Sequence, residues 1–342
     1  FSSRRRHTRL RTVTGVQTCA LPIFITSLRS VYEYPVSTFA IVDQDGINGI
    51  GEAVATPAIV GDSAIEIDRE LHSLSMLLIG KDLSVDEISS LSRTGGYHSS
   101  TIAAIDLALL DYQAKAKNQN IRQYLGINQN YIATDVTIPI CELEDLAKII
   151  QERSEFKSFK VKLKDDSIDR NISKLMRIKE LQPEANLRVD PNQAWDVSYS
   201  ISFLEKLEEN KIDIEYLEQP IDRYDFAGMA EIKRNTSTPI MADEACFTMN
   251  DISTLLEYRA CDIINIKLIK SGGYSNALAM SRYAIENGLQ VSIGSMMEGH
   301  QGIYVAGLLA AAISPFSTHD LDAAWWFTDS QFTYENGELR YA

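Results

Sequence analysis

Apolar and polar residues alternate along the first third of the chain in the pattern of two short strands. The segment STFAIVDQDGINGIGEAV (37–54) carries Asp45–Gly46 at its middle. It predicts a β-hairpin, because an Asp-Gly pair favours a tight turn between strands. Helical spacing of apolar residues follows over about 62–78, 82–93 and 100–117. Strands followed by a run of helices predict a small α+β capping domain over residues 24–128.

The pattern changes after this point, because short apolar runs now alternate with amphipathic stretches. The runs are TDVTIPI (134–140), SFKVKL (158–163), NLRVD (186–190), IEYLE (214–218), PIMAD (239–243), DIINIK (262–267), LQVSIGS (289–295) and STHDLD (317–322). Eight strand–helix units of this kind predict an α/β fold with a (β/α)8, TIM-type barrel over residues 129–325. Periodicity alone leaves a doubly wound sheet open as the alternative. Residues 326–342 are expected to return to the capping domain, and the stop after LRYA indicates a clipped C-terminus.

The first 23 residues have a different composition from the rest of the chain. They contain five arginines and no acidic residue, in a chain whose formal net charge is −14. Their apolar part is too short and too often interrupted by polar residues for a secretory signal. Residues 1–23 resemble translated sequencing-adapter read-through and are therefore predicted to be non-native and to lie outside the fold. A basic targeting arm is the alternative.

Composition and charge limit the class of protein. The chain has 342 residues, of which 45% are hydrophobic and 23% charged, as in a globular protein with one large and one smaller domain. The net charge of −14 argues against nucleic-acid partners, and no apolar run is long enough to span a bilayer. Cys19, Cys141, Cys246 and Cys261 lack CxxC spacing, which favours reduced thiols in a cytoplasmic protein. A small-molecule substrate and a homo-oligomeric state are expected.

Charged residues recur at one end of the predicted barrel strands. Asp190, Glu218, Asp243 and Lys267 each lie at the C-terminal end of an apolar run. In a barrel these ends form one rim, which carries the chemistry. Capping of the next helix or a surface ion pair explains any single carboxylate, whereas three in phase favour a shared cation that relieves their repulsion. Ligands that are all oxygen predict Mg²⁺, with Mn²⁺ as the alternative ion.

Lysines on the second predicted strand give this metal site a reaction. The alternation in FKVKLK (159–164) places Lys160 and Lys162 on one face, which by itself indicates a solvated strand. With three carboxylate strands between them, Lys162 and Lys267 would approach a metal-bound carboxylate from opposite sides. The pattern predicts 1,1-proton transfer at the neighbouring carbon through an enediolate intermediate, with one lysine removing the proton and the other returning one. Lys160 is expected to lower the pKa of Lys162.

Five motifs in this order resemble the muconate-lactonizing subgroup of the enolase superfamily. They are KVK (160–162), DPNQAW (190–195), EQP (218–220), ADE (242–244) and IKLIKSGG (266–273), and the resemblance covers about residues 24–340. It implies that Lys162 and Lys267 are the acid/base pair and that Lys160 helps to hold the substrate carboxylate.

The same resemblance implies the metal ligands and their supports. Asp190, Glu218 and Asp243 match the Mg²⁺ ligands, and Asn192 and Glu244 match residues that support them. The mandelate-racemase pattern fits less well, because it has a His–Asp pair where this chain has Lys267.

The eighth predicted strand indicates the substrate. Asp320 and Asp322 share one face of HDLD, where two carboxylates suit a substrate ammonium group, although a helix cap would explain one of them. The matching DxD motif of dipeptide epimerases binds the α-ammonium, which implies a dipeptide, with L-Ala-Glu as the candidate. By the same resemblance Arg29 meets an acidic side chain. Ser295 and Glu298 complete the predicted substrate-binding set.

Other functions fit parts of this pattern. The same site would serve an o-succinylbenzoate synthase, an N-succinylamino-acid racemase or a muconate cycloisomerase, whose substrates lack the free ammonium that Asp320 and Asp322 would bind. A non-catalytic binding protein or an inactive fragment is the remote alternative, against which the complete set of lysines and carboxylates argues. Trp325 and Trp326 depart from the usual family context; they either reshape the pocket or pack under the capping domain, and packing is the favoured interpretation.

Overall fold

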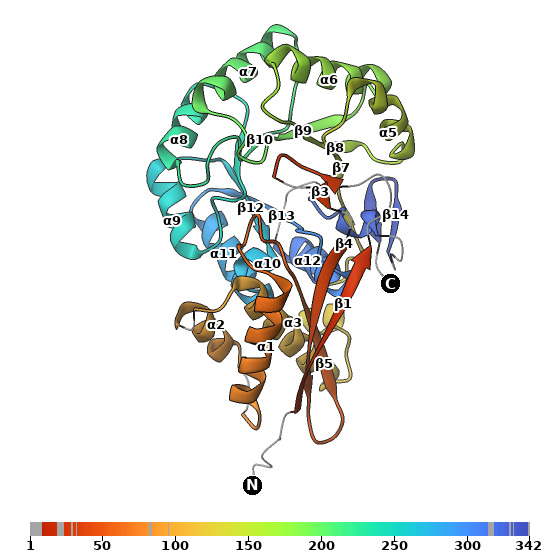
Figure 1. The fold of residues 1–342 in the computed structure, drawn as a ribbon, viewed down its shortest axis with the longest axis vertical. Helices are drawn as coiled ribbons and strands as arrows, with labels where there is room; N and C mark the ends of the chain where they lie inside the picture. Colours follow the sequence, from red (N-terminus) through yellow and green to blue (C-terminus); the bar gives the residue numbers. More distant parts are fainter. Residues whose placement is uncertain are drawn as a thin grey trace.

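The fold consists of a capping region and a larger region built around a parallel sheet (Figure 1). The structure is a computed structural model. It describes residues 9–18, 24–28, 30–31, 33–81, 84–94, 96–313, 318–327, 330 and 332–340.

The cap contains the hairpin that the sequence predicts. Strands β4 (Glu33–Val42) and β5 (Asn48–Val54) pair antiparallel. Gly46 takes φ 84° in the turn, and Asp43 Oδ1 accepts the backbone N–H groups of Asp45 and Ile47, each at 3.0 Å. Gly51 lets β5 approach the helix behind it, because a Cβ at this position would lie 1.9 Å from the carbonyl oxygen of Ala104. The predicted hairpin is thus confirmed.

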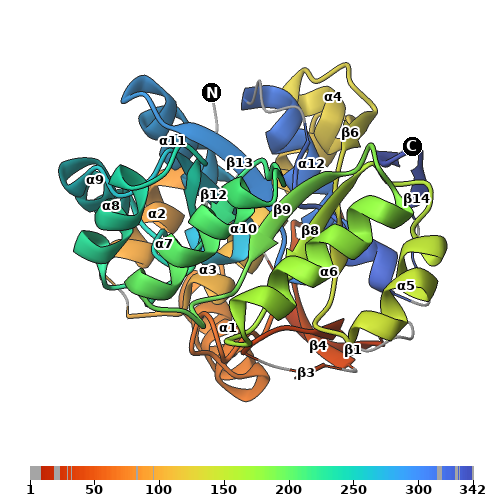
Figure 2. The same cartoon turned by 90° about the horizontal axis from the view of Figure 1, so that it is seen from above.

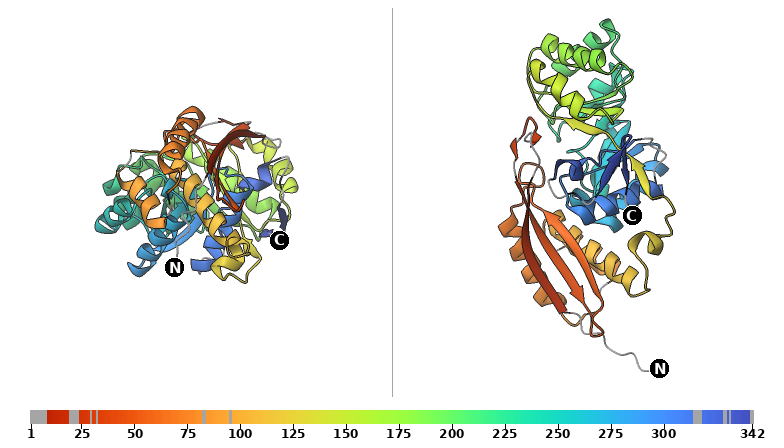
Figure 3. Two further views of the ribbon diagram at one scale, coloured as in Figure 1. Left: turned by 90° about the horizontal axis from the view of Figure 1, so that it is seen from below. Right: turned by 90° about the vertical axis from the view of Figure 1, so that its right-hand side faces the viewer.

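A third strand of this sheet comes from residues 1–23, the segment with the unusual composition. Strand β1 (Arg9–Thr18) pairs antiparallel with β4 along its whole length, giving the order β1-β4-β5. Figure 3 shows these strands as a long layer that extends away from the barrel. Leaving residues 9–18 out of the fold was therefore wrong, since they protect one edge of β4. The adapter origin of residues 1–23 stays a prediction.

Helices cover one face of the cap sheet, as the spacing of apolar residues predicts. The helices that contact the sheet are α1 (Ala64–Leu78) and α3 (Ser99–Lys115), whereas α2 (Val85–Thr94) and α4 (Ile121–Leu125) pack against α3. A capping box of Ser63 and Glu66 starts α1. Helix α3 is buried along most of its length because it packs between β5 on one side and the barrel helix α10 on the other.

The larger region is the predicted barrel. Its strands are β7 (Val136–Ile138), β8 (Ser158–Lys162), β9 (Asn186–Asp190), β10 (Leu217–Glu218), β11 (Ile240–Ala242), β12 (Ile263–Lys267) and β13 (Gln290–Gly294). They form one parallel seven-stranded sheet in chain order. The eighth predicted strand is reduced to two bridges, Thr134 to His319 and Gly294 to Asp320, which join the two ends of the sheet.

Helices follow the strands on the outside of the sheet (Figure 2). They are η1 (Leu143–Asp145), α5 (Leu146–Glu152), α6 (Ile168–Leu181), α7 (Val197–Glu209), α8 (Phe226–Arg234), α9 (Met249–Tyr258), α11 (Tyr274–Glu286) and α12 (His300–Ile313). Two further short helices, α10 (Leu268–Ser271) and η2 (Ala323–Trp326), contact residues at the strand ends.

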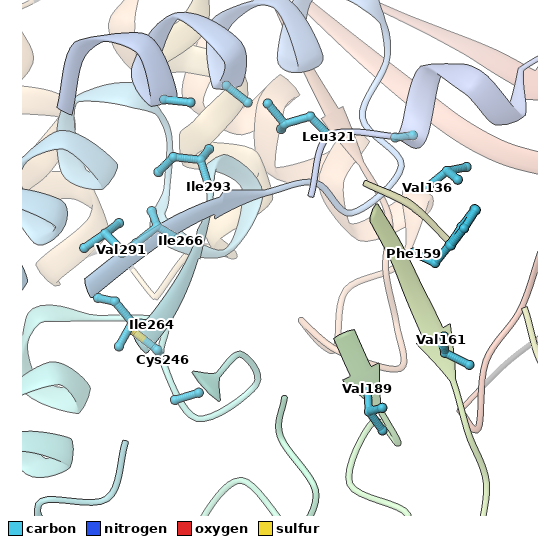
Figure 4. Packing of buried hydrophobic residues seen from close by; sticks show 14 of the residues in the cluster. Val136, Phe159, Val161, Val189, Cys246, Ile264, Ile266, Val291, Ile293 and Leu321 are labelled. Carbon is cyan, nitrogen blue, oxygen red and sulfur yellow. The ribbon is translucent and has the colours of Figure 1, made fainter. Parts of the chain in front are cut away.

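Alternation along the barrel strands separates the apolar core from the interior of the barrel. Phe159 and Val161 of β8 belong to the apolar cluster between sheet and helices (Figure 4). Lys160 and Lys162, the alternate residues, line a cavity inside the barrel. The period of two thus places the lysines where the sequence predicts them.

The C-terminal segment pairs with a strand at the start of the barrel region. Strands β14 (Thr333–Glu335) and β15 (Glu338–Arg340) form a small sheet with β6 (Tyr131–Ala133) in the order β14-β15-β6. The expected return to the capping domain is thus replaced by pairing with β6, whose edge would otherwise lack partners. Near the rim, β2 (Phe24–Ile25) and β3 (Ser30–Val31) pair in a two-stranded sheet.

The remaining expectations about class concern thiols and membranes. Cys141, Cys246 and Cys261 are free. In the part of the chain that the structure describes, no helix combines the length and apolar character that a bilayer crossing requires.

Candidate active site

A cavity of about 50 Å³ lies at the C-terminal ends of the barrel strands, under the cap. Most of the residues that the sequence predicts for the site line it: Lys160, Lys162, Asn192, Asp243, Lys267, Ser295, Asp320 and Asp322. Thr26, Leu28 and Ile59 of the capping region contribute to the wall. The rim therefore collects side chains from strands far apart in sequence, as a barrel requires.

The three predicted metal-binding carboxylates are buried and lie at the ends of adjacent strands. Asp190 ends β9, Glu218 ends β10 and Asp243 follows β11. Each faces an ammonium group: Asp190 Oδ2 lies 2.5 Å from Lys162 Nζ, and Asp243 Oδ2 lies 2.7 Å from Lys267 Nζ. Glu218 is paired with Lys160 in the same way, at 2.8 Å.

Lys160 lies at the centre of this group. Its Nζ is 2.8 Å from Glu218, 2.8 Å from Asp320 and 3.3 Å from Asp190. Burial lowers the pKa of Lys160, but the charges of Asp320, Glu218 and Asp190 outweigh burial and raise this pKa well above its usual value. Lys160 is therefore a permanent cation that joins carboxylates from three positions of the rim.

Asp243 carries two lysines, one of which the sequence analysis missed. Lys270, in the short helix α10, has its Nζ 2.5 Å from Asp243 Oδ1 and also contacts the carbonyl oxygen of Asp243. Burial raises the pKa of Asp243, but Lys267 and Lys270 together lower it far below its usual range. Burial likewise lowers the pKa of Lys267, but Asp243 and Asp320 raise it above its usual value. Lys267 is thus held protonated in this arrangement.

The donor set fits a hard divalent cation in its chemistry. Asp190, Glu218 and Asp243 supply only oxygen atoms, and they are buried on neighbouring strands. Burial raises the pKa of Glu218, and the charges of Asp190 and Asp243 raise it further, against the opposing effect of Lys160. Among the described residues, no three His, Cys, Asp or Glu side chains have the arrangement of a formed metal centre. The assignment of these three carboxylates as metal ligands therefore stays a prediction.

Amide side chains hold the carboxylates in place. Asn192 takes φ 47°, and its Nδ2 donates to Asp190 Oδ2 at 3.3 Å and to Glu244 Oε1 at 3.2 Å. Gln219 Oε1 accepts the backbone N–H groups of Asp243 and Ala245 at 3.1 and 3.0 Å. Burial, followed by the charges of Asp243 and Asp190, raises the pKa of Glu244 to about 7. Asn192 and Glu244 thus lie beside the carboxylates, as the resemblance implies.

The two aspartates of the eighth strand have different surroundings. Asp320 Oδ2 is 2.8 Å from Lys160 Nζ and 3.9 Å from Lys267 Nζ. Asp322 Oδ2 accepts neutral donors, the backbone N–H of Thr137 at 2.7 Å and the indole Nε1–H of Trp326 at 3.0 Å. The lysines lower the pKa of Asp320 against the effect of burial, whereas burial and the charge of Asp320 raise the pKa of Asp322.

Three further predicted residues have different outcomes. Ser295 lines the cavity and donates its hydroxyl to the carbonyl oxygen of Asp320 at 3.1 Å. Glu298 is buried outside the cavity lining, where its Oε2 accepts the backbone N–H of Met296 at 2.5 Å. Glu298 also raises the pKa of Glu52 in the cap, and the charges of Lys267 and Asp320 act on Glu298, so its predicted role in substrate binding stays a prediction. Arg29 lies outside the described residues.

Several residues of the site were not predicted from the sequence. Lys270 and Gln219 stand inside the motifs IKLIKSGG and EQP, so the motifs themselves were the available signal. Asn265 alternates with Lys267 on β12 and donates to Glu218 at 2.9 Å, which the period of two could have revealed. Thr137 acts through its backbone, for which a sequence carries no pattern.

Both regions of the chain match known families. Residues 8–126 match the mandelate racemase / muconate lactonizing enzyme N-terminal domain, and residues 142–341 match the enolase C-terminal domain-like family. The L-Ala-D/L-Glu epimerase of Bacillus subtilis (strain 168) is 32% identical over 325 residues, which cover 93% of this chain and 88% of that protein.

Solved structures are similar over the whole chain. A substrate-liganded complex of the Bacillus subtilis L-Ala-D/L-Glu epimerase has a TM-score of 0.92 at 30% identity, covering 98% of this chain and 96% of the other. A dipeptide epimerase from Enterococcus faecalis V583, complexed with Mg and the dipeptide L-Leu-L-Tyr, has a TM-score of 0.89 at 26% identity, covering 98% and 97%.

Proposed function

The chain belongs to the mandelate racemase / muconate lactonizing enzyme family of the enolase superfamily, and from this premise we propose that it is a dipeptide epimerase. The proposed reaction is 1,1-proton transfer at the α-carbon of a dipeptide, next to its carboxylate. One observation carries the proposal: Lys162 of β8 and Lys267 of β12 line the same cavity, with the carboxylate strands β9, β10 and β11 between them.

The two lysines supply the acid and the base. Lys162 and Lys267 approach from opposite walls of the barrel, so each serves one face of the α-carbon. Carboxylate partners raise the pKa of Lys267, which keeps it in the form that returns a proton. Lys160, permanently charged beside them, attracts the substrate carboxylate.

We assign Asp190, Glu218 and Asp243 as the ligands of Mg²⁺, with Mn²⁺ as an ion that suits the same oxygen donors. The bound cation would stabilise the negative charge that develops on the substrate carboxylate. Asn192 bonds Asp190, and Gln219 and Lys270 bond the backbone and side chain of Asp243, so these residues would restrict the movement of two of the three ligands.

The substrate end of the site favours a free amino group. Asp320 and Asp322 both line the cavity, and two carboxylates suit an ammonium ion better than an N-succinyl group. L-Ala-Glu is the first candidate, supported by the similarity to L-Ala-D/L-Glu epimerases, and Arg29 is proposed to meet the acidic side chain. The cavity of about 50 Å³ is far below the ~300 Å³ at which ligand pockets begin, so binding a dipeptide requires residues of the cavity wall to move. Free cysteines support a reducing compartment such as the cytoplasm.

Deuterium uptake tests the proposal. A dipeptide library and, separately, a set of N-succinylamino acids are incubated with the protein in D₂O and Mg²⁺. Mass spectrometry records incorporation at the α-carbon, with EDTA-treated protein as the control. We expect one deuterium in a subset of dipeptides, lost with EDTA and restored by Mg²⁺. Uptake confined to N-succinylamino acids would replace this proposal with the racemase alternative, and no uptake in either class would reject catalysis of this kind.

A further inference from the structure

Asp322 is fixed by two neutral donors that come from different parts of the fold. The carboxylate is 4% exposed and lies in the cavity wall. The backbone N–H of Thr137, on β7, and the indole N–H of Trp326, in η2, both donate to the same oxygen, Oδ2. Two donors on one oxygen set the plane of the carboxylate and therefore the direction of Oδ1.

Both donors depend on one buried guanidinium group. Arg153 is 0% exposed, and its Nε donates at 3.2 Å to the carbonyl oxygen of Thr137, the residue whose N–H bonds Asp322. The same guanidinium lies 5.1 Å from the ring centre of Trp326 and 4.5 Å from that of Trp325. A buried cation over two aromatic faces is held firmly in place. Arg153 thus links the two groups that orient Asp322.

Asp320 and Asp322 therefore have different relations to a positively charged ligand. Asp320 is paired with Lys160 at 2.8 Å, so its charge is already compensated. Asp322 receives neutral N–H groups and has no part in the described ion pairs of the rim lysines, while the charge of Arg153 acts on it from behind the two donors. Of the two aspartates, Asp322 is the better partner for an incoming ammonium ion.

We propose that Trp326 is a positioning residue that orients Asp322 toward the α-ammonium group of the substrate, and that Arg153 holds both donors of Asp322 in place. The inference rests on the proposed function. Trp326 acts on substrate selection rather than on proton transfer, because it bonds Asp322, whereas Lys162 and Lys267 are bonded to Asp190 and Asp243. A carboxylate that is already oriented binds an ammonium ion with less loss of freedom.

The neighbouring tryptophan provides a matched control. Trp325 lies against Trp326 with ring centres 5.2 Å apart, contacts Phe156 edge-on, and lies over the same guanidinium. Trp326→Phe keeps an aromatic ring but removes the N–H donor to Asp322. Trp325→Phe makes the same change of size one residue earlier and leaves that donor in place. Trp326 is fully buried and Trp325 only partly, so the inhibition constant of a ligand without the amino group is needed to separate lost packing from the lost donor.

The test compares steady-state kinetics of α-carbon deuterium exchange with L-Ala-L-Glu, in Mg²⁺, for wild type and both variants. We expect Trp326→Phe to raise KM about 10-fold with kcat changed less than about twofold, the size expected when a hydrogen bond to a charged group is lost. Trp325→Phe is expected to leave both constants within about twofold. The inhibition constant of N-propionyl-L-Glu, which lacks the amino group, should be the same in all three proteins.

Arg153→Lys adds a second line of evidence. It keeps the charge but loses the bond from Nε to Thr137, so we expect a rise in KM in the same direction, about threefold. Melting temperatures of all variants in the presence of Mg²⁺ show whether each protein is folded. If Arg153→Lys is unfolded, the kinetics of Trp326→Phe alone test the positioning role.

The outcomes separate this inference from the function on which it rests. A wild-type protein without exchange on any dipeptide overturns the proposed function, and this inference with it. An active wild type with unchanged KM in Trp326→Phe, or with equal changes in both tryptophan variants, overturns the inference alone. A parallel rise in the inhibition constant of N-propionyl-L-Glu would do the same, because the effect would then not concern the amino group.

Discussion

The barrel rim and the contact between barrel and cap are held by different kinds of interaction. At the rim, the single ammonium group of Lys160 lies within 3.3 Å of three carboxylates, those of Asp190, Glu218 and Asp320. All four groups are buried. At the cap, the described contacts include single hydrogen bonds: Ser27 Oγ donates to the carbonyl oxygen of Pro191 at 2.7 Å, and Arg223 Nη1 donates to that of Ile59 at 3.1 Å.

This difference distinguishes the groups proposed for catalysis, at the rim, from the cap residues that cover the cavity. Removing one partner of a buried ion pair costs about 3–5 kcal/mol, whereas one hydrogen bond contributes about 1 kcal/mol. Breaking one of these cap hydrogen bonds therefore costs less than breaking an ion pair of the rim. A fixed catalytic group under a cover that can move fits a site whose cavity, about 50 Å³, must enlarge to admit a dipeptide.

The largest expected effect comes from breaking the rim at Asp243. Asp243→Asn leaves Lys267 and Lys270 without their shared carboxylate, so we expect the free energy of unfolding in metal-free buffer to fall by about 3–5 kcal/mol. Urea denaturation measures this change. The exposed pair of Lys206 and Glu209 supplies the control, because Glu209→Gln should cost less than about 1 kcal/mol. Equal losses in the two variants would contradict the contrast between buried and exposed pairs.

A second prediction concerns pH at the contact between cap and barrel. Burial, and the charge of Glu298, raise the pKa of Glu52 from 4.5 to about 7, and Glu52 accepts the backbone N–H of Gly302 at 2.8 Å. The folded state thus binds this proton more tightly than the unfolded state. The contribution of Glu52 to stability is full below about pH 4.5 and is lost as the pH rises to about 7.

Glu52→Gln removes this dependence but keeps an oxygen acceptor for Gly302. We expect the free energy of unfolding of the variant, relative to wild type, to increase by about 3 kcal/mol between pH 4.5 and pH 8, measured by urea denaturation. A difference between the two proteins that does not change with pH would show that Glu52 is not protonated on folding.

The smallest expected effect lies in the cover of the site. Arg223→Gln loses the bond to Ile59, a residue of the cavity wall, so we expect KM for the dipeptide to rise about threefold to tenfold, with about 1 kcal/mol lost in stability. Steady-state deuterium exchange measures the first and urea denaturation the second. Arg177→Gln, at an exposed arginine paired with Glu180, should change neither. An unchanged KM in Arg223→Gln would remove Ile59 from the account of substrate access.

The chemistry of the rim was predictable because it follows from two periods. Alternation within β8 fixes the direction of Lys160 and Lys162, and the recurrence of a charge at each strand end fixes Asp190, Glu218 and Asp243. The first is a property of neighbouring residues, and the second recurs once in each strand–helix unit, after 28 and then 25 residues. The predicted hairpin and the helices of the cap depend on local patterns in the same way.

What the sequence missed depends on contacts between distant residues. The N–H of Thr137 reaches Asp322 across 185 positions, and Arg153 joins Thr137 to Trp326, so no local pattern announces the group. Trp326 was interpreted as packing under the cap, whereas it bonds Asp322 inside the barrel region. Residues 1–23 were left out of the fold because of their composition, although the β-branched run TVTGVQT within them is typical of a strand and lies in β1.

The central claim is that Lys162 and Lys267 serve opposite faces of one α-carbon, and exchange resolved by epimer tests it most directly. Lys162→Ala and Lys267→Ala are each incubated in D₂O and Mg²⁺ with L-Ala-L-Glu and, separately, L-Ala-D-Glu, and mass spectrometry follows deuterium uptake. We predict that epimerisation falls at least about 10³-fold in both variants, and that each retains exchange with one epimer only, a different one in each. Exchange of both epimers by either variant, or the same surviving epimer in both, would contradict the account.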